Sequence, residues 1–133
     1  MLGEVISEGK GKRSGRRITA TSPKLIVEVS FEDRSKMLGM DGFNIGTYVS
    51  STRPDGTLDG EGQGVFAGPD GELATWKAVG NGHYLPSGAV SYRGGITFSA
   101  ASPKLQRLNA VAGAFEFEVD PEGNTHSKIW EWK

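Results

Sequence analysis

The sequence contains no cysteine among its 133 residues, which excludes disulfide bonds, cysteine-ligated zinc and thiol nucleophiles. It also lacks any apolar run near the ~18–20 residues of a membrane span. The amino-terminal segment MLGEVISEGKGKRSGRR has no apolar signal-peptide core. We therefore expect a cytoplasmic protein with no membrane partner.

Charge is nearly balanced, with a net charge of −1 and an isoelectric point near 6.1. No overall field would attract nucleic acid or an anionic surface. Residues 10–17 do hold five cations, at Lys10, Lys12, Arg13, Arg16 and Arg17, but no aromatic residue for base stacking. We interpret this segment as a mobile, solvated loop or hairpin and expect no nucleic-acid partner.

Helix signals are scarce, whereas short alternating segments are frequent. In Leu25–Phe31 the residues Leu25, Val27, Val29 and Phe31 share one face, and Phe115–Val119 alternates more strictly. Further strands are expected at residues 4–7, 18–21, 45–51, 62–67, 73–79, 89–99 and 127–132, which gives about eight. Type I turns are indicated at Arg53–Gly56, Gly68–Gly71 and Asp120–Gly123, each with proline second and glycine fourth.

Eight short antiparallel strands in one domain of residues 1–133 predict an all-β barrel, with a β-sandwich as the alternative. The 20 glycines favour the barrel, because coiled strands need glycine at corners and bulges. Gly60, Gly62, Gly64, Gly80 and Gly82 suit that role. The sequence therefore predicts a single eight-stranded antiparallel barrel.

The string SPKL occurs twice, at residues 22–25 and 102–105. The second copy predicts a short helical turn near 102–108, with Ser102 as N-cap, Pro103 in the first helical position and Asn109 ending the turn in a left-handed conformation. The first copy leads directly into a strand. Because the flanking residues align only with a gap, we interpret the two strings as separate boundary signals rather than a duplicated site.

From about Gly60 to Lys133 the chain resembles the allene oxide cyclase barrel-like group of small bacterial proteins. The segments that carry the resemblance are Gly60–Gly64, Gly80–His83, Tyr92–Phe98, Ser102–Asn109, Phe115–Val119 and Ile129–Trp132. The resemblance implies an eight-stranded barrel with an inner cavity, in a group that often forms oligomers. Members with known activity cyclise or bind apolar molecules, and many others have no known role. None of the cyclases' catalytic residues can be placed on this sequence by motif.

Candidate ligand-binding residues are those expected to face the barrel interior or its rim. Trp76 shares one face of its strand with Ala74 and Ala78, and Lys77 lies on the other face. Trp76 is therefore expected to point inward, where it either contacts a ligand or simply fills the interior. Tyr92 and Phe98 carry the same two alternatives. Asn81 and Tyr84, beside His83 in Gly80–Pro86, are expected at the rim.

Two residues are candidates for acid–base catalysis, Glu116 and His83. Glu116 would have a raised pKa if the Phe115–Val119 strand turned its glutamates inward; the simpler alternative places them in water. A rim histidine can move protons near pH 7, although a solvated loop histidine is the ordinary alternative. Two unclustered histidines do not make a metal site, and we expect no metal and no cofactor.

The chain ends in Ile129–Trp132, with Trp130 and Trp132 on one face. This pattern indicates either packing of a closing strand or a subunit interface. The leading functional hypothesis is a barrel that binds a small apolar or amphipathic molecule, with isomerase or cyclase activity as its extension. The alternative is a non-enzymatic structural barrel, and a homo-oligomer is expected in either case.

Overall fold

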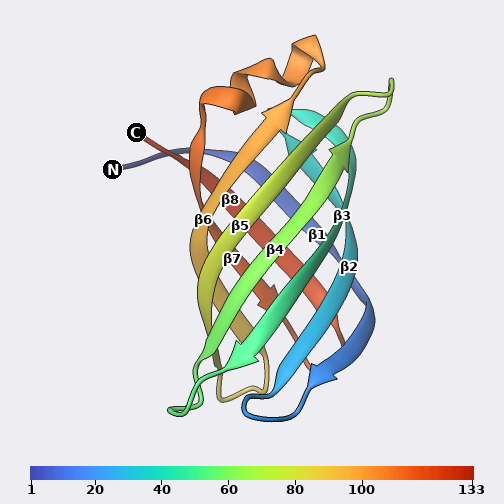
Figure 1. Cartoon of the computed structure of the whole chain (residues 1–133). Helices are drawn as coiled ribbons and strands as arrows, with labels where there is room; N and C mark the ends of the chain where they lie inside the picture. Colours follow the sequence, from blue (N-terminus) through green and yellow to red (C-terminus); the bar gives the residue numbers. More distant parts are fainter.

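Eight antiparallel strands pair in sequence order and close into a barrel, because β8 returns to pair with β1 (Figure 1). The computed structural model describes all 133 residues. The strands are β1 (Leu2–Ala20), β2 (Ile26–Met37), β3 (Met40–Thr52), β4 (Leu58–Ala67), β5 (Leu73–Tyr84), β6 (Val90–Ala100), β7 (Ala112–Val119) and β8 (Asn124–Trp132), and one 3₁₀ helix, η1 (Pro103–Ala110), lies between β6 and β7. The all-β barrel prediction is confirmed. No helix in the structure is long and apolar enough to cross a membrane.

Strand β1 is the element that closes the barrel, and it corrects one expectation. Its first part, Leu2–Lys12, pairs with β8, while Ser7–Ala20 pairs with β2. The cationic residues 10–17 therefore belong to a strand, with a register irregularity between Arg13 and Gly15, and the prediction of a mobile loop was wrong. The expected strands at 4–7 and 18–21 lie at the two ends of this single element, because pairing with β2, and with β8 as far as Lys12, holds the polar segment extended.

The three predicted proline–glycine turns all connect neighbouring strands. Gly56 and Gly123 each donate a backbone hydrogen bond of 2.9 Å, to the carbonyl oxygens of Arg53 and Asp120 respectively. Gly56, Gly71 and Gly123 have φ values between 84° and 88°, a region that favours glycine. These turns confirm that the sequence marks the hairpin ends correctly.

Alternation along each strand separates the barrel interior from its outer face. On β2, Val29, Phe31 and Met37 are buried, whereas Glu32 and Lys36 between them are exposed. On β5, Trp76 faces inward and Lys77 faces outward, as the sequence predicts. Outward charges pair across strands, for example Arg17 with Glu28 at 3.3 Å.

Glycines on β3, β4 and β5 make room for the aromatic rings of the interior. A Cβ atom at Gly46 would lie 2.7 Å from both the Phe31 and the Trp76 rings, and one at Gly64 would overlap the Trp76 ring. Gly60 and Gly82 similarly underlie Tyr92. The glycines were expected at corners and bulges; instead these positions lie in regular register and accommodate rings.

Helix η1 covers one end of the barrel, the upper end in Figure 1, where it lies across the strands. Leu105 and Leu108 are fully buried and pack against Phe66, Ala74 and Ala100. An ion pair of 2.5 Å between Arg107 and Glu131 ties η1 to β8. The expected helical turn is therefore confirmed, and its leucines form an apolar lid on the interior.

The ends of η1 are held differently from the sequence expectation. The Ser102 side chain makes no capping bond within η1; its hydroxyl oxygen accepts a 3.0 Å hydrogen bond from the Leu73 backbone N–H. Asn109 does not adopt a left-handed conformation, because its side-chain amide pairs with both backbone groups of Ala100, at 2.7 and 2.8 Å. Both side chains thus attach the helix to neighbouring strands.

We predict that Gly64→Ala lowers the free energy of unfolding by about 1–3 kcal/mol, because the new methyl group overlaps the Trp76 ring and the Ile45 carbonyl oxygen. Gly15→Ala is the matched control, since no atom lies within 4 Å of its Cβ position. Urea unfolding of both variants measures the difference. Equal losses in the two variants would contradict the proposed role of the interior glycines.

Candidate functional site

Five aromatic rings line one side of the barrel interior, and we call them the aromatic wall: Phe31, Tyr48, Trp76, Tyr92 and Phe117. The ring centroids of Phe31 and Phe117 are 4.9 Å apart, and Tyr48 meets both Tyr92 and Phe117 edge-on at 5.5 Å. Such tilted contacts are favourable for aromatic pairs. The rings come from β2, β3, β5, β6 and β7, so this wall depends on the closed barrel.

The rings do not fill the interior completely. A cavity of about 80 Å³ remains, enough for roughly three waters at ~30 Å³ each and about half the ~150 Å³ that holds a benzene molecule. It is lined by Ser7, Phe31, Ser35, Met37, Asn44, Tyr48, Gly60, Glu61, Gly62, Trp76, Ala78, Gly80, Tyr92, Ile96, Phe115, Phe117, Ser127 and Ile129. A small molecule, but not a long lipid chain, matches this volume.

The other side of the interior is polar, and we call it the polar wall: Ser7, Asp33, Ser35, Thr125 and Ser127. These residues come from three neighbouring strands, because Gly9 on β1 lies opposite both Ser35 and Ser127, and Gly11 lies opposite both Asp33 and Thr125. Glycine at these two positions of β1 leaves room for the side chains of Asp33 and Ser35. The interior is therefore amphipathic in cross-section.

Asn44 connects the two walls through its side-chain amide. Its Oδ1 accepts a 2.8 Å hydrogen bond from Trp76 Nε1, and its Nδ2 donates a longer one of 3.4 Å to Asp33 Oδ2. The indole bond sets the amide orientation, since an acceptor must face the indole N–H. As a result the amide N–H₂ group faces the carboxyl group of Asp33.

Asp33 is an acid held almost entirely out of water, with 5% of its surface exposed. Burial raises its pKa above the ordinary value of 3.8, because the charged form loses hydration; the Asn44 amide and the nearby Ser35 hydroxyl partly oppose this. Its Oδ1 atom, the Ser35 hydroxyl and the Thr125 hydroxyl are buried without a partner in good hydrogen-bond geometry. The polar wall therefore has unused hydrogen-bonding capacity.

The tyrosines of the aromatic wall are poor acids in this setting. Burial raises the pKa of Tyr48 and of Tyr92 above the ordinary value of 10. The Tyr92 hydroxyl donates or accepts a 2.9 Å hydrogen bond with the buried Ser50 hydroxyl. Both phenols stay protonated at neutral pH and offer hydrogen bonds rather than charge.

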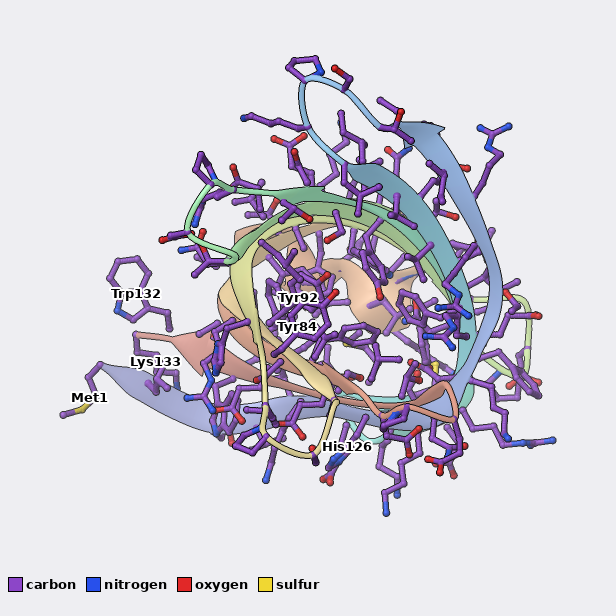
Figure 2. All side chains as sticks on the ribbon, turned by 90° about the horizontal axis from the view of Figure 1, so that it is seen from below. Met1, Tyr84, Tyr92, His126, Trp132 and Lys133 are labelled. Atoms are coloured by element: carbon purple, nitrogen blue, oxygen red, sulfur yellow. The ribbon has the colours of Figure 1, made fainter.

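Trp76 and Tyr92, two of the predicted ligand-binding residues, line the cavity. Phe98 faces inward beside Trp76 in register but does not line the cavity. Tyr84 is 63% exposed and is the last residue of β5, at the end of the barrel opposite η1. In Figure 2 both Tyr84 and Tyr92 lie within the ring of strands. Tyr84 thus lies at the mouth of the barrel.

Asn81, Glu116 and His83 lie outside the interior. Asn81 accepts a 2.9 Å hydrogen bond from Arg53, and Glu116 lies 3.9 Å from Arg93 on the exposed face of β7. His83 is exposed and opposite Ser91. The structure therefore confirms the simpler orientation of the glutamates, and it brings neither Glu116 nor His83 into contact with the cavity.

Sequence analysis missed the polar wall, although a signal for it exists. The alternation of Val27, Val29 and Phe31 continues through the next residues, so Asp33 and Ser35 are the following inward positions. The strand was expected over Leu25–Phe31, whereas β2 continues to Met37. A buried aspartate within a strand breaks the apolar pattern used to recognise inward positions.

The terminal tryptophans belong to the closing strand, as one of the two expectations stated. Trp130 pairs in register with Val5 of β1 and Ala114 of β7, and Lys128 Nζ lies 5.5 Å from its ring centroid. Trp132 is 65% exposed and projects away from the barrel in Figure 2. Neither ring reaches the cavity. No group of three or more histidine, aspartate or glutamate side chains comes together to hold a metal ion.

No family model matches the sequence, and no curated protein matches it. Solved structures of the same fold do exist. A beta-barrel like protein from Acinetobacter baumannii has a TM-score of 0.84 at 12% identity, covering 100% of this chain and 96% of that chain. A conserved protein of unknown function from Rhodopseudomonas palustris has a TM-score of 0.81 at 13% identity, covering 98% and 97%.

A fungal enzyme has a related but less similar structure. The enzyme, from Penicillium herquei, has a TM-score of 0.64 at 16% identity and covers 98% of this chain and 95% of that chain. Identities this low show a shared fold and nothing about activity. The fold is therefore that of other small β-barrel proteins.

We predict that the free energy of unfolding of Asp33→Asn, taken relative to that of the wild type, is higher at pH 7 than at pH 3.5. The folded-state pKa is raised, so the folded protein binds the proton more tightly than the unfolded chain, and stability falls as pH rises from ~3.9 through the raised pKa. Asparagine does not titrate and removes this loss, which is worth ~1.4 kcal/mol per pKa unit.

Urea unfolding at both pH values measures the effect, with Asp41→Asn on the exposed face of β3 as the control. The control is expected to change stability by at most about 1 kcal/mol at either pH. If the free energies of unfolding of wild type and Asp33→Asn differ by the same amount at pH 3.5 and at pH 7, Asp33 is not a buried carboxylate whose ionisation destabilises the fold.

Proposed function

We propose that this protein binds a small apolar or amphipathic molecule inside the barrel. The observation that supports the proposal is the cavity of about 80 Å³ between the aromatic wall and the serines of the polar wall. Protein interiors are normally packed with few voids larger than a water, so space of this size supports a site for a very small molecule. Ligand size is limited to roughly three or four non-hydrogen atoms unless rings move.

The resemblance to the allene oxide cyclase barrel-like group extends the proposal to an isomerase or cyclase. The enzyme from Penicillium herquei supports it to the extent that a barrel of this kind accommodates catalysis. In this chain the buried acid beside the cavity is Asp33, joined to the cavity-lining Asn44. A buried, protonated carboxyl group can donate a proton or a hydrogen bond to a reacting oxygen.

We predict that 2-propanol, with four non-hydrogen atoms, binds the cavity and changes the fluorescence of Trp76. The measurement uses a Trp130→Phe/Trp132→Phe background, so that only the interior tryptophan reports. Ala78→Leu adds three carbon atoms to a cavity-lining position and is expected to weaken binding at least tenfold, because it occupies the ligand space.

Thr75→Leu, on the exposed face of the same strand, is the matched control and should bind 2-propanol as the parent does. Thermal unfolding establishes that both variants are folded. Equal binding by Ala78→Leu and Thr75→Leu, or an unchanged Trp76 signal throughout the titration, would refute the interior as the site.

A second candidate function is self-association as a structural barrel, favoured by apolar side chains on the outer face. Phe43, Ala67 and Leu73 lie side by side in register across β3, β4 and β5, and Ile45 lies beside Val65 in the next outward row. Phe43, Ile45 and Leu73 are each more than half exposed. Because the barrel is closed and has no free strand edge, a second copy would contact this face through side chains.

We predict that Ile45→Glu shifts the molar mass measured by light scattering from that of an oligomer to that of a monomer, because a buried unpaired carboxylate opposes association. Thr97→Glu, on the outer face of β6 away from these rows, is the control and should leave the mass unchanged. A monomeric mass for the unaltered protein would remove this candidate.

A further inference from the structure

A register shift in β1 places two arginines on the inward face at the mouth of the barrel, the lower end in Figure 1. The shift lies between Arg13 and Gly15. Arg13 lies opposite Phe31 and Arg16 opposite Val29, and both partners are buried inward positions. Residues opposite each other point to the same side of a sheet, and a bulge moves the alternation by one residue. Both arginines therefore face the barrel axis, although they are three residues apart.

Arg13 and Arg16 are the arginines that have no partner for their positive charge. Every other arginine contacts a carboxylate or an aromatic ring: Arg17, Arg34, Arg53, Arg93 and Arg107. Asp33, one inward row deeper, is hydrogen-bonded to Asn44 instead. Two guanidinium groups on one face repel each other, so an anion between them would stabilise both.

Arg13 is held against the turn between β7 and β8. Its backbone N–H donates a 2.7 Å hydrogen bond to the Gly123 carbonyl oxygen, and a Cβ atom at Gly123 would lie 3.3 Å from Arg13 Nη2. Arg16 is exposed to solvent at the same end of the barrel. Because their partners on β2 are two residues apart, the Cα atoms of the two arginines are separated by roughly 7 Å. Side chains of this length reach one small anion from both positions.

A tyrosine hydroxyl lies close to the two arginines. Tyr48 is two strands away from Arg16 in the same inward row. Burial raises the pKa of Tyr48, whereas the positive charges of Arg13 and Arg16 lower it, which requires both guanidinium groups to lie nearby. The Tyr92 hydroxyl is bonded to Ser50 at 2.9 Å, whereas Tyr48 forms no side-chain hydrogen bond within the protein. The Tyr48 phenol is protonated at neutral pH and can donate to an anion.

We propose that the mouth of the barrel binds an oxyanion, a carboxylate or a phosphate group, between Arg13 and Arg16, with the Tyr48 hydroxyl as a further donor. Guanidinium groups suit these anions, because their paired N–H donors match two oxygen atoms at once. The site goes beyond the proposed interior site and does not depend on it, since neither arginine lines the cavity. Its ligand is either free phosphate or the anionic group of a larger molecule.

The test follows the side-chain Nε–Hε signals of Arg13 and Arg16 by nuclear magnetic resonance, just below neutral pH and at constant ionic strength. Inorganic phosphate or butyrate should shift both signals in a saturable manner. Propylammonium carries the propyl chain of butyrate with the opposite charge and should shift neither. Tighter binding of phosphate supports a phosphate ligand, and tighter binding of butyrate supports the carboxylate of an apolar molecule. Arg13→Gln and Arg16→Gln, each measured on the remaining arginine, should weaken the tighter anion roughly three- to tenfold.

Arg17→Gln is the matched control, because it removes the same charge from the outer face of the same strand, where Arg17 pairs with Glu28 at 3.3 Å. It should change the affinity less than twofold, and thermal unfolding establishes that all variants are folded. An equal loss of affinity in Arg17→Gln, binding of propylammonium, or no saturable shift with either anion would overturn the inference. The response of Trp76 to 2-propanol, measured in parallel, reports separately on the interior site.

Discussion

The narrow interior of an eight-stranded barrel is the constraint on which the rest of the structure depends. Such a barrel has room for side chains or for one small ligand, and not for both at full size. Here large rings on some strands are offset by glycines on others, as at Gly46 and Gly64 beneath Trp76. Because the match is incomplete near Ser35 and Asn44, about 80 Å³ stays open. Strand β1 closes the ring of strands, because its residues from Leu2 to Lys12 pair with β8 and those from Ser7 to Ala20 pair with β2.

The same constraint separates polar and apolar chemistry within the interior. Strands β1, β2 and β8 contribute the small polar side chains of the polar wall. Strands β2, β3, β5, β6 and β7 contribute the rings of the aromatic wall, and glycines on β3–β5 lie beneath them. Asn44 joins the two sides by fixed hydrogen bonds to Trp76 and Asp33. A molecule in the cavity would therefore be oriented by its polar group, with its carbon skeleton towards the rings. Orientation of this kind serves a binding protein directly, and it is also the first requirement of a barrel enzyme.

Sequence patterns were sufficient for the fold and for part of the site. Alternation and proline–glycine turns predicted the strands, and Trp76 and Tyr92 were placed correctly because apolar residues at alternate positions mark the interior. The cationic segment 10–17 was misread because long-range pairing makes it a strand, with β2 on one side and, as far as Lys12, with β8 on the other. Asp33 and Ser35 were missed since polar residues carry no inward signal of their own. Asn81, Glu116 and His83 were chosen by residue type, and their phase in the strands places them outside.

The central claim is that the interior, rather than any hollow on the outer face, receives a ligand. An outer-face hollow does exist, bordered by Val79 and Trp132. The most direct test is a set of intermolecular nuclear Overhauser effects between bound 2-propanol and assigned side-chain protons. Contacts are predicted to Trp76, Phe31 and Tyr92, all of which line the cavity and none of which borders the outer hollow. Contacts to Val79 and Trp132, with none to Trp76, would contradict the claim.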